Sequence, residues 1–231
     1  MGDNSGGLDP EFGEELRNWL PSTGDRLFVE TLGGAVLDPL GLSAPGEQRS
    51  PIGRWGLYAD GFLHAADRIV ESWAGQPWED ELIYPILALY RHHLELQLKL
   101  VIRSSPGFTD ELREWLYRTH ELDKLWNKLE EVYPESHSWA SRECTGACAE
   151  PLKELSEHDP KSMAAHYPVD RQERQTLEQL RAIDLRILKR GVHKISHYLG
   201  TIIESIHLER VAFRNRVLVA LCRAEKASAR A

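Results

Sequence analysis

The chain has 231 residues, of which 42% are hydrophobic and 28% are charged, and its formal net charge is −8. This composition is typical of a globular protein with an apolar core. The acidic balance argues against a protein that coats nucleic acid over its whole surface, because such proteins are usually basic. A local basic cleft is still compatible with it.

The first residues lack the basic and apolar segments of a signal peptide. The most apolar stretch, residues 82–102, is interrupted by Arg91, Glu95 and Lys99, so we expect no membrane span. The chain has three cysteines, an odd number, which together with the lack of an export signal indicates a reducing compartment. We therefore expect a cytoplasmic protein.

Two regions are expected along the chain. Residues 1–54 are rich in Gly, Pro and Ser, which predicts an irregular N-terminal arm with one short helix at residues 11–20. Residues 55–231 are expected to form a helical domain that contains a loop-rich insertion at residues 134–175. Proline and glycine recur in this insertion and leave room for at most one short helix, near residues 150–157.

Apolar residues at helical spacing predict the remaining elements. The helix expected at residues 79–104 is apolar around most of its circumference, as a central helix would be. Gly191 and Gly200 interrupt the last helix and indicate close helix packing or a kink. The other helices are expected at residues 57–73, at residues 110–118 with Thr109 as the cap, at residues 120–132, and from residues 171–177 to His207 or beyond.

No segment shows the alternating pattern of a half-buried strand, and no internal repeat is present. The sequence therefore predicts an all-α helical bundle. A loop-rich N-terminal arm would precede the bundle, and one long loop would precede its last long helix.

Four residues that can carry positive charge fall on one face of the last predicted helix. Arg186, Arg190, His193 and His197, the Arg/His face, share an arc of about 60° at the spacing of an α-helix. Apolar residues gather on the opposite face. Two interpretations are open. The face is either a solvated surface, or a basic groove in which Arg holds a phosphate and His transfers a proton.

A polar stripe runs along the helix predicted at residues 79–104. It consists of Arg91, His92, Glu95 and Lys99, and both Arg91–Glu95 and Glu95–Lys99 are i,i+4 pairs. Charges on so apolar a helix need partners, because an unpaired buried charge is costly. The stripe is therefore either a structural ion network or a ligand-binding or catalytic site.

Cys144 and Cys148 are separated by three residues, and His137 and His158 lie nearby, a spacing that suits structural zinc. No second ligand pair completes the set, so a zinc site, a labile disulfide and unreactive thiols are all open. Cys222 is expected in the core. Common nucleotide-binding, hydrolase and metalloprotease motifs are missing from the sequence, and we expect no resident metal or cofactor.

Four segments resemble those of a group of uncharacterised bacterial helical proteins. Residues 82–99 are similar to its central YP…LYRH…EL.LK helix, residues 120–126 to its H.L..LW segment and residues 58–67 to its Y..GF..AAD helix. Residues 166–170 resemble its RYPVD segment, with His in the position where Arg is more usual. The resemblance covers residues 54–207.

That group is HEPN-like, and the resemblance implies a four- or five-helix bundle that acts as a homodimer in bacterial defence or stress. Active HEPN proteins are metal-independent ribonucleases with a motif of Arg, four to six residues and then His. Both Arg/His pairs of the Arg/His face have six intervening residues and fit this spacing. Ile187 and Gly191 stand where the motif usually has a polar residue, a departure from the family's pattern.

Three functions are compatible with these features. The leading hypothesis is a non-catalytic binding module, in which the polar stripe is structural or holds a small ligand or protein partner and the Arg/His face is open to water. The alternative is a metal-independent endoribonuclease, in which Arg186 and Arg190 bind phosphate while His193 and His197 transfer protons to and from RNA. A third hypothesis is a structural subunit bound through the arm and the insertion.

Overall fold

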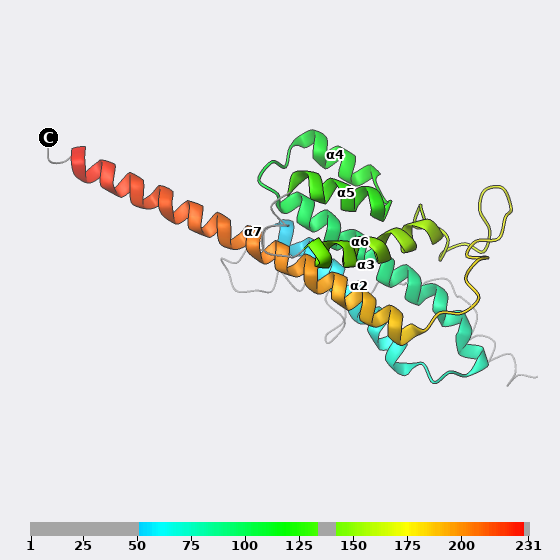
Figure 1. Ribbon diagram of the computed structural model, residues 1–231. Helices are drawn as coiled ribbons and strands as arrows, with labels where there is room; N and C mark the ends of the chain where they lie inside the picture. Colours follow the sequence, from blue (N-terminus) through cyan, green and yellow to red (C-terminus); the bar gives the residue numbers. More distant parts are fainter. Residues whose placement is uncertain (1–50, 134–141, 229–231) are drawn as a thin grey trace, which may run out of the picture. The chain divides into compact units, whose positions relative to one another are not determined.

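The computed structural model describes residues 51–133 and 142–228, which belong to the second of two units, Met1–Gln48 and Arg49–Ala231. These residues are predominantly helical, and the fold is all-α (Figure 1). Within the described ranges, the only β-pairing is a single bridge between Val169 and Gln175. The helix expected at residues 11–20 lies outside them. None of the helices described is both long and apolar enough to cross a membrane.

Helix α2, Pro51–Ser72, begins earlier than the predicted start at residue 57. Proline suits the first turn of a helix, because its missing N–H would have no partner there. The chain turns after α2 at Gly75, whose φ of 75° is readily adopted by glycine. The Glu79 carboxylate accepts hydrogen bonds from the backbone N–H groups of Ala74 and Gln76, at 2.9 and 3.0 Å, and fixes this turn.

The helix predicted at residues 79–104 is divided in two. A 3-10 helix, η1 (Pro77–Leu82), is followed by the α-helix α3 (Ile83–Ser104). Pro85 lies in the first turn of α3 and cannot donate to the carbonyl of Glu81, so the α-helical ladder does not extend back into η1.

Helix α3 is the centre of the fold, as its apolar circumference predicted. It packs against α2, α5 (Leu122–Val132) and α7 (Leu185–Ser228), and α5 packs in turn against α6 (Arg142–His158) (Figure 1). Fully buried side chains from these helices form one core, and α3 contributes the most of them. Its largest members include Ile86, Tyr90, Leu94, Leu98, Leu125, Leu129, Leu152 and Leu199.

Helix α4, Asp110–Arg118, has the predicted bounds. The Thr109 hydroxyl accepts a hydrogen bond from the backbone N–H of Leu112 at 3.2 Å, which confirms Thr109 as the cap. Helix α5 begins at Leu122, two residues later than predicted. The backbone carbonyl of His120, just before it, accepts a hydrogen bond from Arg91 instead.

Helix α6 corrects the expectation of at most one short helix in residues 134–175, because it has 17 residues. Gly146 and Pro151, which predicted breaks, lie inside the helix. Cys148 and Leu152 are buried on its inner face. Burial of this face outweighs the low helix propensity of the glycine and the proline.

Helix α7, Leu185–Ser228, starts later than the predicted residues 171–177 and continues through residues 211–224 as one helix. Its start is fixed by Asp184, whose Oδ1 accepts hydrogen bonds from the backbone N–H groups of Arg186 and Ile187, at 2.9 and 3.1 Å. A carboxylate at this position caps the helix and complements its dipole.

Candidate functional site

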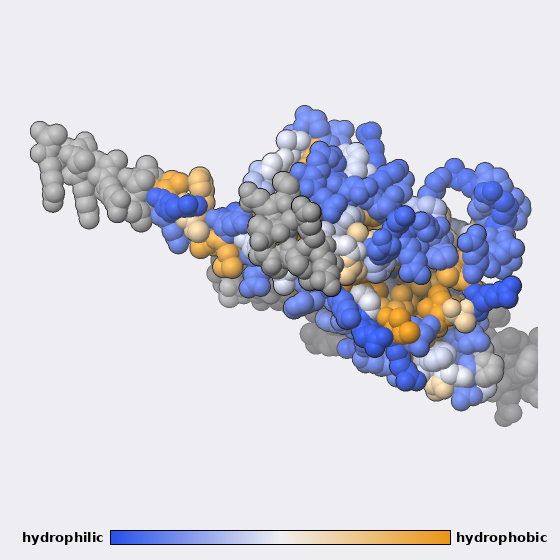
Figure 2. All heavy atoms as spheres, in the orientation of Figure 1, coloured by the Kyte–Doolittle hydropathy of each residue, from blue (hydrophilic) through white to orange (hydrophobic). Residues whose placement is uncertain are grey.

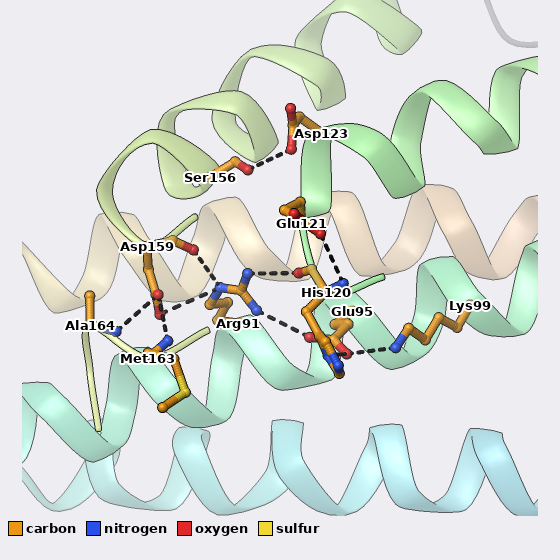
Figure 3. A network of polar contacts seen from close by, with 10 residues as sticks. All are labelled: Arg91, Glu95, Lys99, His120, Glu121, Asp123, Ser156, Asp159, Met163 and Ala164. Atoms are coloured by element: carbon orange, nitrogen blue, oxygen red, sulfur yellow. Dashed lines mark hydrogen bonds and ion pairs between the residues drawn. The ribbon is translucent and has the colours of Figure 1, made fainter. Parts of the chain in front are cut away.

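The polar stripe of α3 is buried. Arg91, Glu95 and Lys99 are only 1%, 2% and 4% exposed, and Figure 3 shows their side chains directed toward one another and toward neighbouring segments. His92 does not share this arrangement. Its ring lies edge-on against Phe62, with the centroids 4.4 Å apart, and burial is the main cause that lowers the pKa of His92.

Arg91 connects three segments of the chain. Its Nη1 donates to Glu95 Oε2 on the same helix at 3.1 Å. Its Nη2 donates to the backbone carbonyl of His120, between α4 and α5, at 2.8 Å. Its Nε donates to the backbone carbonyl of Asp159 at 3.1 Å and lies 3.5 Å from that residue's carboxylate. Arg91 therefore holds α3, the α4–α5 connection and the end of α6 together.

Glu95 accepts hydrogen bonds from three side chains. Besides Arg91, these are Lys99 Nζ at 2.8 Å and His120 Nδ1 at 2.9 Å, both on Oε1. Burial by itself would raise the pKa of Glu95, but hydrogen bonding and charge from Lys99 and His120 outweigh it and lower that pKa. The His120 side chain is 52% exposed, so the network reaches solvent at this ring.

Asp159 completes the group, which we call the ion network (Arg91, Glu95, Lys99, His120 and Asp159). Its carboxylate faces Arg91 through Oδ2, while Oδ1 accepts hydrogen bonds from the backbone N–H groups of Met163 and Ala164 at 2.7 and 3.0 Å (Figure 3). Asp159 thus anchors the segment that follows α6.

A cavity of about 390 Å³ lies beside the ion network. It is bounded by α3, α6, α7 and residues 159–184, and its lining is predominantly apolar. Figure 2 shows hydrophobic side chains gathered at the surface beside the first turns of α7. Arg91 and Asp159 belong to both the network and the cavity lining.

Residues 159–184 form one wall of the cavity through an ordered set of turns. Thr176 Oγ1 donates to the backbone carbonyls of Ala164 and Tyr167, at 3.0 and 2.6 Å. Leu177, the next residue, lines the cavity and has a φ of 55°, in the left-handed region that disfavours a branched side chain. The hydrogen bonds beside it hold this residue in a costly conformation.

A second polar cluster joins α2, α3 and α7. His193 Nε2 lies 3.0 and 2.9 Å from the two carboxylate oxygens of Asp67, and the Tyr90 hydroxyl donates to Asp67 Oδ1 at 2.7 Å. Lys189 Nζ lies 3.6 Å from Asp67 and donates to Glu71 at 2.6 Å. Burial would raise the pKa of Asp67, but the hydrogen bonds from His193 and Tyr90 outweigh it and lower that pKa.

The Arg/His face is therefore divided. His193 is oriented by a carboxylate of α2, whereas Arg186, Arg190 and His197 are exposed on α7. The predicted spacing on one helix is confirmed. None of the four residues lines the cavity beside the ion network.

Among the described residues, no group of three or more His, Cys, Asp and Glu side chains could hold a metal ion. Cys148 is buried on α6. The side chains of Cys144 and Cys222, and all of His137, lie outside the described residues, so the zinc and disulfide interpretations stay predictions.

Sequence reasoning missed Asp67, His120 and Asp159 as partners of the predicted residues. Asp67 and His120 both lie in segments that carried the family resemblance, and this was the available signal for them. Asp159 is separated from Arg91 by 68 positions, and no pattern on either helix pointed to it.

Fold and site together define an all-α protein with a buried ion network beside an apolar cavity. Comparisons of the chain with protein-family models, with curated proteins and with solved structures found no match. The HEPN-like resemblance therefore stays a prediction.

Proposed function

We propose that this chain is a binding protein, and that its cavity holds a small hydrophobic molecule. The observation that carries the proposal is the cavity itself. It is partly open to solvent, has a volume of about 390 Å³ and has a mostly apolar lining. That volume falls within the range of about 300–1,000 Å³ typical of small-molecule sites, which are also mostly apolar.

Two further features support a binding role. Leu177 is held at a positive φ while it lines the cavity, and such backbone strain clusters at ligand-binding sites. The ion network satisfies its own charges, which fits a structural function beside the ligand. Exposure of Arg186, Arg190 and His197 agrees with what the binding hypothesis expects of the Arg/His face.

Binding can be tested with Nile red, a neutral dye whose fluorescence rises in apolar surroundings. Gly191 lines the cavity, and a Cβ there would meet no atom within 4 Å, so the side chain of Gly191→Leu can start without a clash and fill part of the cavity. Leucine also has a higher helix propensity than glycine, so the variant is expected to fold. Gly200→Leu is the matched control, because Gly200 is equally unobstructed on α7 but does not line the cavity.

The proposal expects saturable dye binding by the wild-type protein and by Gly200→Leu, and loss of binding in Gly191→Leu. Equal binding by all three proteins would place the dye elsewhere and reject the cavity as the binding site. Absence of saturable binding to the wild-type protein would reject the proposal as well.

A metal-independent endoribonuclease is the second candidate, and one observation favours it. Asp67 contacts His193 Nε2 with both carboxylate oxygens, the arrangement by which a carboxylate orients a catalytic histidine. Arg190 and Arg186 lie about one and two turns from His193 on the same helix and could hold a phosphate. The resemblance to HEPN-like proteins adds support from the sequence, together with the expected homodimer and a role in bacterial defence.

This candidate predicts RNA cleavage by the purified protein in EDTA, with both His193→Ala and Asp67→Asn strongly impaired. His207→Ala is the control, since His207 is an exposed histidine of α7 that lies outside both the Arg/His face and the Asp67 cluster. Activity that survives in His193→Ala, or no activity in the wild-type protein, would exclude cleavage at this site.

A further inference from the structure

The charges that line the cavity are unevenly balanced. Arg91 is already paired with Glu95 and with Asp159. Two more carboxylates line the cavity, those of Glu154 on α6 and Asp184 at the start of α7. Within the described residues, neither has an ion-pair partner. The lining therefore carries an excess of negative charge.

The two unpaired carboxylates are not equivalent. Asp184 Oδ1 caps α7, and the positive end of the helix dipole offsets part of its charge. Glu154 is exposed on α6 and has no such compensation; one turn further on, His158 also lines the cavity. Glu154 is thus the less compensated charge of the two.

We propose that the cavity's ligand is a hydrophobic amine, an apolar body that carries one ammonium group. This inference rests on the proposed function, since it requires that a small molecule bind in the cavity. The apolar body would pack against the leucine and isoleucine lining, and the ammonium would pair with the unpaired carboxylates. A carboxylate ligand would meet charges of its own sign and bind more weakly.

The size of the cavity favours a compact ligand. Its volume of about 390 Å³ lies near the lower end of the range for small-molecule sites, which suits a compact ring system better than a long acyl chain. Three compounds that share one bicyclic ring system and differ in charge are therefore suitable probes: 2-naphthylmethylamine, 2-naphthylmethanol and 2-naphthoate.

The experiment measures displacement of Nile red from the full chain by each of the three compounds at pH 7. The amine is expected to bind most tightly and the carboxylate most weakly. Glu154→Gln and Asp184→Asn each remove one charge, and asparagine retains the ability to cap α7. Each is expected to reduce the ratio of amine to carboxylate affinity by up to about fivefold. A change of this size corresponds to the interaction energy of a partly exposed ion pair. Glu157→Gln, exposed on α6 and outside the lining, is the matched control and is expected to leave the ratio unchanged.

The outcomes separate this inference from the proposed function. If Nile red binds and Gly191→Leu abolishes its binding, but the three compounds compete equally or the carboxylate competes best, the amine is rejected while the binding function stands. If the amine is preferred but the preference is the same in Glu154→Gln, the charge argument fails. Because Glu154 is exposed, that variant decides the question even if Asp184→Asn does not fold.

Discussion

The guanidinium of Arg91 and the carboxylate of Glu95 lie 3.1 Å apart, with side chains only 1% and 2% exposed. Removing two charges from water costs several kcal/mol for each ion, and their mutual attraction offsets this only when the remaining donors and acceptors are also paired. Arg91 meets this condition through two backbone carbonyls, and Glu95 meets it through Lys99 and His120.

Loss of the Glu95 charge is therefore expected to destabilise the protein strongly. Glu95→Gln leaves the buried Lys99 without a carboxylate and leaves Arg91 with Asp159 alone. Breaking a buried pair in this way costs about 3–5 kcal/mol. Urea denaturation monitored by circular dichroism would measure this change in the free energy of unfolding. Glu157→Gln is the control, because its pair with Lys153 is long, at 3.9 Å, and both side chains are about two-thirds exposed. If the two variants lose similar stability, the ion network is not structural.

Mild acid is expected to weaken the fold through His93. The ring is fully buried, Nδ1 donates to the carbonyl of Ala59 at 2.8 Å, and Nε2 has no hydrogen-bond partner within residues 51–133 and 142–228. Burial, the largest effect, holds the pKa of His93 below its ordinary value of 6.5, although the hydrogen bond to Ala59 opposes it. The unfolded chain therefore takes up this proton first. The stability that the neutral His93 ring contributes is fully present above about pH 6.5 and is lost as the pH falls toward the pKa of His93 in the folded protein.

Thermal unfolding between pH 7.5 and pH 5 would measure this slope. His93→Gln keeps a donor for Ala59 but removes the titration, so we expect a smaller slope over this range, whereas His64→Gln, a change at an exposed ring, should leave it unaltered. Burial also lowers the pKa of His92, so this ring adds to the slope and part of the slope remains in His93→Gln. Glu95 and Asp67 do not interfere. Their pKa values are lowered from 4.5 and 3.8, so the stability they contribute is lost only at lower pH. An unchanged slope in His93→Gln would contradict the assignment.

Tyr90→Phe is expected to affect Asp67 in a specific way. Tyr90 is fully buried, and the change removes its hydroxyl, which donates to the partly buried Asp67 Oδ1 at 2.7 Å. Such a hydrogen bond stabilises a protein by about 1 kcal/mol, and its loss also destabilises the carboxylate form of Asp67. We expect a higher Asp67 pKa in an NMR titration of the carboxyl carbon. Tyr84→Phe, at an exposed position, should leave that pKa unchanged, and a shift of similar size there would refute the prediction.

Two glycine substitutions are expected to change the free energy of unfolding in opposite directions. A Cβ at Gly200 in α7 would meet no atom within 4 Å, so the close packing suggested by the sequence is not needed there. Gly200→Ala should therefore stabilise the protein by about 0.5–1 kcal/mol through helix propensity. Gly75 has a φ of 75°, where alanine is strained, and Gly75→Ala should destabilise it by about 1 kcal/mol. Chemical denaturation would measure the free energy of unfolding of both variants. If Gly75→Ala stabilises the protein, the turn adopts another conformation and the prediction is wrong.

The fold was predictable where local signals agreed with packing. Thr109 caps α4 at the expected residue, and the apolar circumference of residues 79–104 predicted the central helix. It was not predictable where tertiary contacts override local preference. Pro151 lies inside α6, and Asp184 rather than an earlier residue starts α7. Glycine and proline lower the stability of a helix locally, but only the packed core shows whether burial of the helix outweighs this loss.

The candidate site was predictable along each helix but not between helices. The i,i+4 spacing connected Arg91, Glu95 and Lys99 because these residues share α3. Asp159 and Asp67 approach from other elements, and the sequence contains no periodic pattern that links them to Arg91 or His193. The cavity could not be predicted at all, because it depends on how α3, α6 and α7 leave space beside the segment at residues 159–184.

The ion network also bears on how long the folded state persists. The backbone acceptors of Arg91 belong to residues 29 and 68 positions away along the chain, so its bonds form only after the α4–α5 connection and the end of α6 have both reached α3. Contacts of such separation require large loops to close first, which places them late in folding. Interactions absent from the transition state govern the rate of unfolding rather than the rate of folding. The buried charges of α3 would then determine the lifetime of the native protein while contributing little to the speed with which it forms.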